Sequence, residues 1–133
     1  MKPFVMTSSM QSMRGVFYPT GYLFVMLPAL HDAQKLAHDL RASGYSDDLM
    51  LLKPETILEE IGHSVREDGN VFPSVGSEAE TVRHYCELAR KGHFALMIHV
   101  PSEKETQKVM ETVHKSPFSY AQKYRHLVIE EMT

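Results

Sequence analysis

The sequence predicts an α+β domain with a ferredoxin-like fold, a two-layer sandwich in which helices pack on a four-stranded sheet. Three observations lead to this prediction. A strand-like segment followed by a helix-like segment occurs twice, and helix-forming sequence separates the two copies. The length of 133 residues and the 43% apolar content are those of one globular domain. We therefore expect the order β-α-β, a helical insertion, and a second β-α-β.

The two copies share a pattern of strand, proline and helix. The first runs from Gly21 through an apolar strand to Pro28, and the second runs from Gly92 to Pro101. A Gln-Lys pair follows each proline at the same distance, and apolar residues with helical spacing surround it. Since proline is tolerated in the first turn of a helix, each copy predicts a strand followed by an amphipathic helix.

Each element is predicted from an apolar run and from the residues that end it. Four strands are expected over residues 22–27, 49–52, 94–100 and 124–129. One helix begins at Pro28 and ends before Gly44, and another begins at Pro54 and ends near Val65. Capping boxes begin two more helices at 77 and 102, and turn-forming residues predict a loop over 68–76.

Residues 1–20 are predicted to form an N-terminal arm, and residues 21–133 to form the single domain. The arm is rich in Met and Ser, and a short apolar segment within it ends at a Pro-Thr-Gly turn. Pro19 excludes a central strand there and leaves an edge strand or a lid. Three methionines of the arm, Met6, Met10 and Met13, are candidates for docking on an apolar groove of a protein partner.

The predicted strands are apolar on both faces, whereas a sheet with one solvated face should alternate. In residues 22–27, for example, neither set of alternating side chains is polar. The second face therefore needs a cover, from the middle helices, from the arm, or from a second subunit. We expect a homodimer, because large exposed apolar surfaces mark interfaces.

Composition excludes several classes of protein. The net charge of −3 argues against a general nucleic-acid binder. The longest apolar run is too short to span a bilayer, and no signal-peptide core is present, so no membrane partner is expected. The single cysteine, Cys86, fits a reducing cytoplasm, and its place on an apolar helix face indicates a small buried hydrophobe.

Candidate functional residues are few. The chain has eight histidines, but their spacings are not those of metal sites, and no phosphate-binding or other cofactor motif is present. No metal and no cofactor are therefore expected. His99 is the first candidate for a base or ligand, because it lies late in an otherwise apolar strand. Met97, Tyr85 and Tyr124 are the other candidates for lining a ligand pocket, the tyrosines as core rings with hydroxyls at an edge.

Three segments resemble the small bacterial stress-protein domains of the heat-induced or general-stress type. They are the turn at residues 42–48, the helix end Tyr85-Cys86-Glu87-Leu88-Ala89-Arg90-Lys91-Gly92, and the closing residues 124–131. The resemblance spans roughly residues 21–131, and it implies no established catalytic residues that could be carried over to this chain. The Gly-rich insertion of that family is largely replaced here by helix-forming sequence.

Two main functions are therefore expected from the sequence, and a third hypothesis is a scaffold whose Met-rich arm or Phe72-Pro73 loop contacts another protein. The first is a stress-type protein that acts as a small binding or interaction module. The alternative is a dimeric α+β barrel enzyme, or a haem- or metal-binding protein, that uses a pocket histidine such as His99. Whether the protein is an enzyme stays open at this point.

Overall fold

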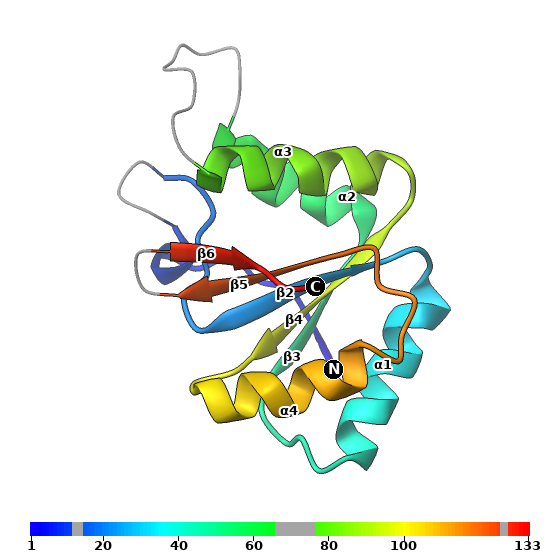
Figure 1. The fold of residues 1–133 in the computed structure, drawn as a ribbon. Coiled ribbons are helices and arrows are strands. Elements are labelled where there is room, and N and C mark those ends of the chain that lie inside the picture. Colours follow the sequence, from blue (N-terminus) through cyan, green and yellow to red (C-terminus); the bar gives the residue numbers. More distant parts are fainter. Residues whose placement is uncertain (12–14, 66–76, 126–127) are drawn as a thin grey trace.

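The central feature of the computed structural model is a twisted sheet with helices on both faces (Figure 1). The structure describes residues 1–11, 15–65, 77–125 and 128–133. The α+β class is confirmed, but the described sheet has six strands, not the four expected. The strands are β1 (Lys2–Pro3), β2 (Tyr22–Leu27), β3 (Leu49–Leu52), β4 (Phe94–His99), β5 (Tyr120–Arg125) and β6 (Val128–Glu131).

The strand order is β1-β3-β4-β2-β5-β6. The two strands beyond the expected four lie at the edges. β1 has two residues and pairs in parallel with β3, with Lys2 opposite Met50. The other pairings are antiparallel, which makes the sheet mixed. A strand this short is defined by its partner and not by its own sequence, so an apolar pattern cannot reveal it.

The last predicted strand, over residues 124–129, is wrong. The chain reverses within that range, because β5 ends at Arg125 and β6 begins at Val128 and pairs antiparallel with β5. β5 itself begins earlier, at Tyr120, and contains Gln122 and Lys123, which are both buried. Polar residues in a buried strand do not produce the apolar run on which the prediction depended.

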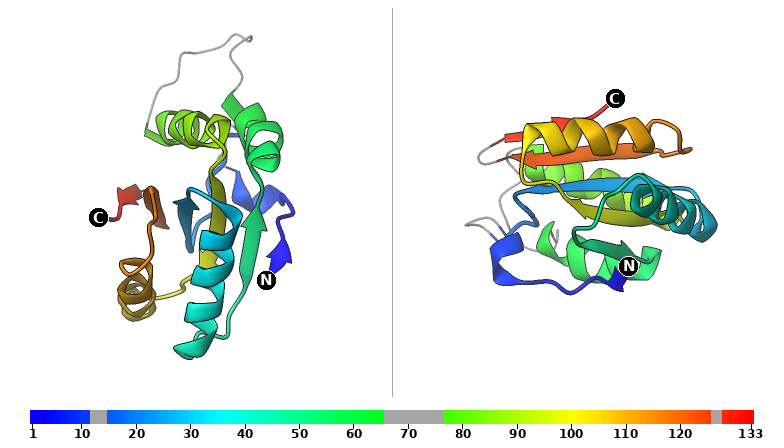
Figure 2. Two further views of the ribbon diagram at one scale, coloured as in Figure 1. Left: turned by 90° about the vertical axis from the view of Figure 1, so that its right-hand side faces the viewer. Right: turned by 90° about the horizontal axis from the view of Figure 1, so that it is seen from below.

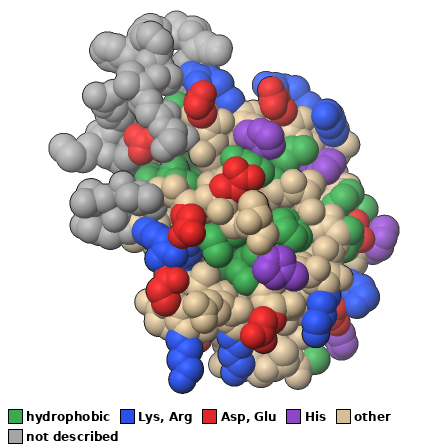
Figure 3. All heavy atoms as spheres, viewed as in Figure 1, with side chains coloured by type: hydrophobic (Ala, Val, Ile, Leu, Met, Phe, Trp, Pro, Cys, Tyr) green, Lys and Arg blue, Asp and Glu red, His purple; other side chains and the backbone are tan. Residues whose placement is uncertain are grey.

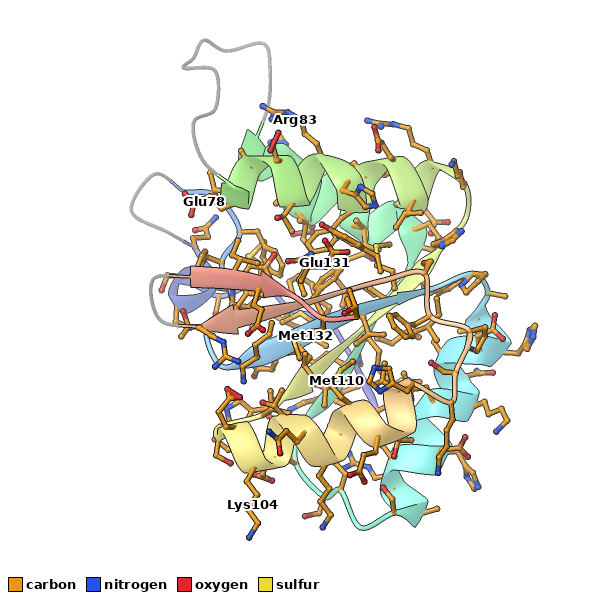
Figure 4. The ribbon with its side chains drawn as sticks, in the orientation of Figure 1. Glu78, Arg83, Lys104, Met110, Glu131 and Met132 are labelled. Atoms are coloured by element: carbon orange, nitrogen blue, oxygen red, sulfur yellow. The ribbon has the colours of Figure 1, made fainter. Side chains whose placement is uncertain are left out.

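Helices α1 (Leu30–Ala42) and α4 (Glu103–Val113) lie side by side on one face of the sheet, which we call the lower face (Figure 2). Met110 points from α4 toward the sheet, while Lys104 points away from the protein (Figure 4). The apolar residues between these helices and the strands form one continuous core, which comprises Leu23, Val25, Leu27, Ala33, Leu36, Ala37, Leu40, Leu49, Leu96, Ile98, Val100, Val109, Met110, Val113 and Ala121.

The ends of these two helices follow the expected signals with one shift. Gly44 has φ of +102°, which favours glycine and ends α1 as predicted. Pro28 precedes α1 and is not in its first turn, because Ala29 is the extended N-cap residue. Ser102 caps α4, where its Oγ accepts a hydrogen bond from the Glu105 backbone N–H at 3.1 Å.

The middle of the chain covers the other face of the sheet, which we call the upper face (Figures 1 and 2). It contains α2 (Pro54–Thr56), a π-helical turn η2 (Ile57–Ile61), a 3₁₀ turn η3 (Gly62–Val65) and α3 (Ser77–Arg90). The expected helix from Pro54 is therefore helical but irregular. The loop predicted over residues 68–76 lies outside the described residues.

The N-terminal segment also packs on the upper face. Met10 and Phe17 are buried in the core there, and Phe4 contacts Phe17 edge to face. A short 3₁₀ turn, η1 (Ser8–Met10), leads into this contact. The second apolar face of the strands is thus covered by middle helices and N-terminal residues of the same chain. Among the described helices, none is long and apolar enough to cross a membrane.

Candidate functional site

The four residues predicted to line a pocket fall into two groups. Tyr85, Tyr124 and Met97 are completely buried in the upper core. His99 ends β4 and lies at the rim of the sheet, where its side chain is 35% exposed. The structure therefore brings the two tyrosines and the methionine into one core and leaves the histidine at the surface. Of these four residues, only the histidine has a side chain exposed to solvent.

Tyr85 and Tyr124 meet through their hydroxyl groups, whose oxygens are 2.7 Å apart. The Tyr85 ring also stacks on Phe24, with ring centroids 4.0 Å apart. Burial raises the pKa of both tyrosines, so both hydroxyls stay protonated near neutral pH. The pair satisfies its own polar groups inside the core, as a structural hydrogen bond does.

His99 forms the best-defined ionisable pair at the surface. Its Nδ1 lies 2.8 Å from Oδ2 of Asp47. The hydrogen bond from His99, followed by the Asp48 backbone N–H, holds the pKa of Asp47 below its usual value. An ionised carboxylate can only accept a hydrogen bond, so Nδ1 of His99 carries the hydrogen. The other ring nitrogen, Nε2, remains available to a ligand.

The loop between α1 and β3 holds Asp47 in place. Arg41, in the last turn of α1, donates from Nη1 to the carbonyl oxygens of Tyr45 at 3.0 Å and Asp47 at 2.7 Å. The Tyr45 hydroxyl donates to the His99 carbonyl at 2.6 Å. These contacts join the loop to the end of β4 by two routes, the Tyr45 hydroxyl and the Asp47 carboxylate.

Gly21 and Tyr22 form the other side of the histidine. Tyr22 pairs with His99 in the sheet, and its ring lies against the imidazole, with centroids 5.1 Å apart. A Cβ atom on Gly21 would lie 3.7 Å from Nε2 of His99, and Gly21 has φ of +88°. Because position 21 has no side chain, the approach to Nε2 from that direction stays open.

Two pockets lie beside this end of the sheet. The loop pocket, of about 350 Å³, is lined by Ser43, Gly44, Tyr45, Ser46, Asp47, Glu105, Lys108 and Val109. The strand-end pocket, of about 320 Å³, is lined by Thr20, Gly21, Val100, Pro101, Ser102, Glu103, Lys123, Tyr124 and Arg125. Asp47 therefore bonds His99 and lines the loop pocket, while Gly21 leaves space beside Nε2 of His99 and lines the strand-end pocket.

Asp47 and Lys123 are the members of this region that the sequence did not single out. Asp47 is one of several acidic residues, and the strand that holds its partner lies 52 residues further along the chain. Lys123 is a lone lysine between Gln122 and Tyr124, and its burial depends on where α4 packs. The position of this lysine between predicted strand residues is the one sequence signal for its burial. That signal does not identify the groups with which Lys123 forms hydrogen bonds.

Charge around the site is mixed. Arg125 pairs with Glu103 of α4 and with Glu130 of β6. On the face of the molecule shown in Figure 3, acidic and basic side chains are interspersed. Within the described residues, no three His, Cys, Asp or Glu side chains gather as a metal site would require.

Cys86 is buried on α3, as expected from its position on an apolar helix face. Burial raises the pKa of its thiol. A buried thiol with a raised pKa is a poor nucleophile, which agrees with the structural role predicted for this residue.

The chain was compared with protein-family models, with curated proteins and with solved structures, and no match was found.

Proposed function

We propose that this protein is a small binding module of the bacterial stress-protein type, and that its ligand binds at the sheet end around His99. The observation that carries the proposal is the orientation of the imidazole. Asp47 fixes Nδ1 as a donor, and Nε2 faces the open side of Gly21. A ligand at this position can form a hydrogen bond with Nε2 of His99, whose direction is fixed, and can pack against the ring of Tyr22.

Binding is favoured over catalysis because the surrounding groups are already engaged with one another. Arg41 holds the Tyr45–Asp47 loop, the Tyr45 hydroxyl bonds the His99 backbone, and Arg125 bonds two glutamates. These contacts give a rigid rim and leave the imidazole as the free polar group. A rigid rim with one free group suits recognition, since little ordering is required when a ligand binds.

Nitrogen-detected NMR of the histidine side chains tests the proposal. A fragment set of small carboxylates, amides and alcohols is titrated into the protein, and we expect the Nε2 resonance of His99 to shift first. The variant His99→Gln should lose these shifts. The matched control is His31→Gln, because the His31 side chain is 82% exposed and lies 3.3 Å from Asp32. Shifts that begin elsewhere and persist in His99→Gln would refute the proposal.

The second candidate function is catalysis or metal binding by the same histidine, and the His99–Asp47 hydrogen bond favours it specifically. A carboxylate that orients Nδ1 leaves Nε2 as a general base, or as a ligand for zinc or haem iron. Titration with zinc or with hemin, followed by the absorbance of the complex, separates this candidate from the first. Spectral changes that disappear in both His99→Gln and Asp47→Asn would support it, and unchanged spectra would exclude metal binding.

We also propose a ferredoxin-like description for the four central strands. Their order, β3-β4-β2-β5, with antiparallel neighbours and with α1 and α4 on one face, supports this description. Cytoplasmic location and a homodimer are part of the same proposal. The main reason to expect a homodimer no longer applies, because residues of the same chain cover the second face of the sheet. Sedimentation equilibrium over a range of protein concentrations tests the subunit number.

A further inference from the structure

Lys123 is the only lysine among the described residues that is buried, with 5% of its surface exposed. It lies in β5 on the lower face and forms part of the wall of the strand-end pocket. It is thus on the opposite face of the sheet from His99, because Tyr22 pairs with His99 while the next residue, Leu23, pairs with Lys123. The chemistry of Lys123 is therefore independent of the function proposed for His99.

The hydrogen bonds of Lys123 account for two hydrogens. Nζ lies 3.0 Å from the Val100 carbonyl oxygen and 2.9 Å from Oγ1 of Thr106. The Thr106 hydroxyl donates its own hydrogen to the Ser102 carbonyl at 2.9 Å, so Lys123 is the donor to both partners. A neutral amine has two hydrogens and one lone pair, so these two bonds use both hydrogens and leave the lone pair free.

The burial of Lys123 also favours the neutral amine. Among the described residues, no carboxylate lies within 4.0 Å of Nζ, since Glu103 of α4 and Glu130 of β6 are both bound to Arg125. Burial is the main cause of a lowered pKa for Lys123, and Arg125 adds to it, while Glu103 and Glu130 oppose it. The β2 neighbour on the same face, Leu23, is apolar.

We propose that Lys123 captures a small aldehyde or ketone as an imine in the strand-end pocket. The amine lone pair attacks the carbonyl carbon, and both amine hydrogens leave with the carbonyl oxygen as water. The new C=N nitrogen then takes a proton from solvent. The strand-end pocket, with a volume of about 320 Å³, has room for such a small molecule.

The surroundings can accommodate the product. The protonated imine keeps one N–H, which can donate to the Val100 carbonyl, and Thr106 keeps its bond to Ser102. The local charges are one guanidinium, from Arg125, and two carboxylates, from Glu103 and Glu130. This surplus of one negative charge stabilises a cationic imine, whereas it would oppose an anionic ligand held without a covalent bond.

Reductive labelling of the full-length wild-type protein tests the proposal. The probe is propanal with sodium cyanoborohydride as reductant, at low reagent ratio and near neutral pH, followed by peptide mapping with mass spectrometry. We expect a propyl group on Lys123 before the exposed lysines. Each unit by which the pKa of Lys123 lies below that of an exposed lysine gives about tenfold more free amine. Labelling of exposed lysines while Lys123 stays unmodified would overturn the proposal.

The matched control is Lys104, which lies on the solvent side of α4 (Figure 4). The labelling rate of Lys104 should keep rising with pH until near the ordinary lysine pKa of about 10.4. The rate of Lys123 should level off at lower pH. Identical pH profiles for the two lysines would overturn the proposal, because it requires that Lys123 is a neutral amine at a pH where an exposed lysine is still protonated. The variant Lys123→Met, made only to confirm the peptide assignment, should lack that labelled peptide.

Discussion

Two tyrosine hydroxyls inside a dry core depend on each other for their hydrogen bonds. Tyr85 and Tyr124 are both completely buried, and their oxygens are 2.7 Å apart. In water each hydroxyl would have solvent partners, so the bond between them contributes little net free energy. The free energy of unfolding falls when only one of the two hydroxyls is removed, because the other hydroxyl is then buried without a hydrogen-bond partner.

The first prediction therefore compares single and double variants. Tyr85→Phe leaves the Tyr124 hydroxyl buried without its partner, and we expect the free energy of unfolding to fall by about 1–3 kcal/mol. The double variant Tyr85→Phe with Tyr124→Phe should lose less than the two single losses added together. Urea denaturation of the four proteins measures this difference. Strictly additive losses would show that the hydroxyls do not interact.

The second prediction concerns pH. The folded-state pKa of Asp47 is lowered, chiefly by His99, so the interaction stabilises the protein above the unfolded value of about 3.9 and is lost as the pH falls through the folded value. Asp47→Asn should be less stable than wild type at mildly acidic pH, by no more than about 1 kcal/mol since the pair is partly exposed. The difference should shrink below about pH 4. Thermal unfolding across that range checks it, and a constant difference would contradict it.

At the scale of single elements, a π-helical turn interrupts the helical cover of the upper face. It spans Ile57–Ile61 and buries both of these isoleucines completely. Gly62 follows it and lies against Cys86 of α3, where a Cβ on Gly62 would be 3.0 Å from the Cys86 Sγ. The close approach of this turn to α3 therefore depends on the absence of a side chain at position 62.

The third prediction uses that contact. Gly62→Ala should lower the free energy of unfolding by about 1 kcal/mol or more, because the added methyl group forces the turn and α3 apart. Cys86→Ala removes the sulfur, so in the Cys86→Ala background the Gly62→Ala change should cost less. A double-mutant cycle in urea measures the coupling. Equal costs in the two backgrounds would mean that the sulfur is not the obstacle.

The helices and strands that could be predicted are those whose own residues show a clear apolar pattern. β2, β3 and β4 were found because apolar residues fill them on both faces, and α1 and α4 because their apolar positions recur with helical spacing. β5 was misplaced, because its buried Lys123 is stabilised by Val100 and Thr106 from elsewhere in the fold. His99 was selected from its position in a strand, but its partner Asp47 depends on the loop after α1. Local pattern predicts an element, and only tertiary packing determines its partner.

At the scale of the whole molecule, α2 and α3 lie over the upper face of the sheet (Figure 2), and apolar residues of the N-terminal segment belong to the same core. Phe17 is completely buried and contacts the rings of Phe4, Phe24 and Tyr124. The N-terminal segment is thus part of the core cover, and the helices α2 and α3 alone do not complete it.

The fourth prediction follows from this arrangement. Removal of residues 1–11 takes away Phe4 and Met10 and uncovers the side of Phe17. We expect a loss of stability of several kcal/mol, since burying one large apolar side chain contributes about 1.5–3 kcal/mol. Binding of a dye that fluoresces on apolar surfaces should increase at the same time. Unchanged stability and dye binding would show that the N-terminal segment does not contribute to the core.

The order of the strands has a consequence for how the two repeated sequence units fold. The first unit supplies β2 and β3, the second supplies β4 and β5, and their strands alternate in the order β3-β4-β2-β5. Neither unit has two adjacent strands, so neither can form a sheet by itself. We infer that the halves become ordered together, in one cooperative step dominated by contacts between distant residues. The repeated pattern therefore lies within one folding unit, and we expect a chain cut between the halves to regain the β3-β4-β2-β5 part of the sheet only when both pieces are mixed.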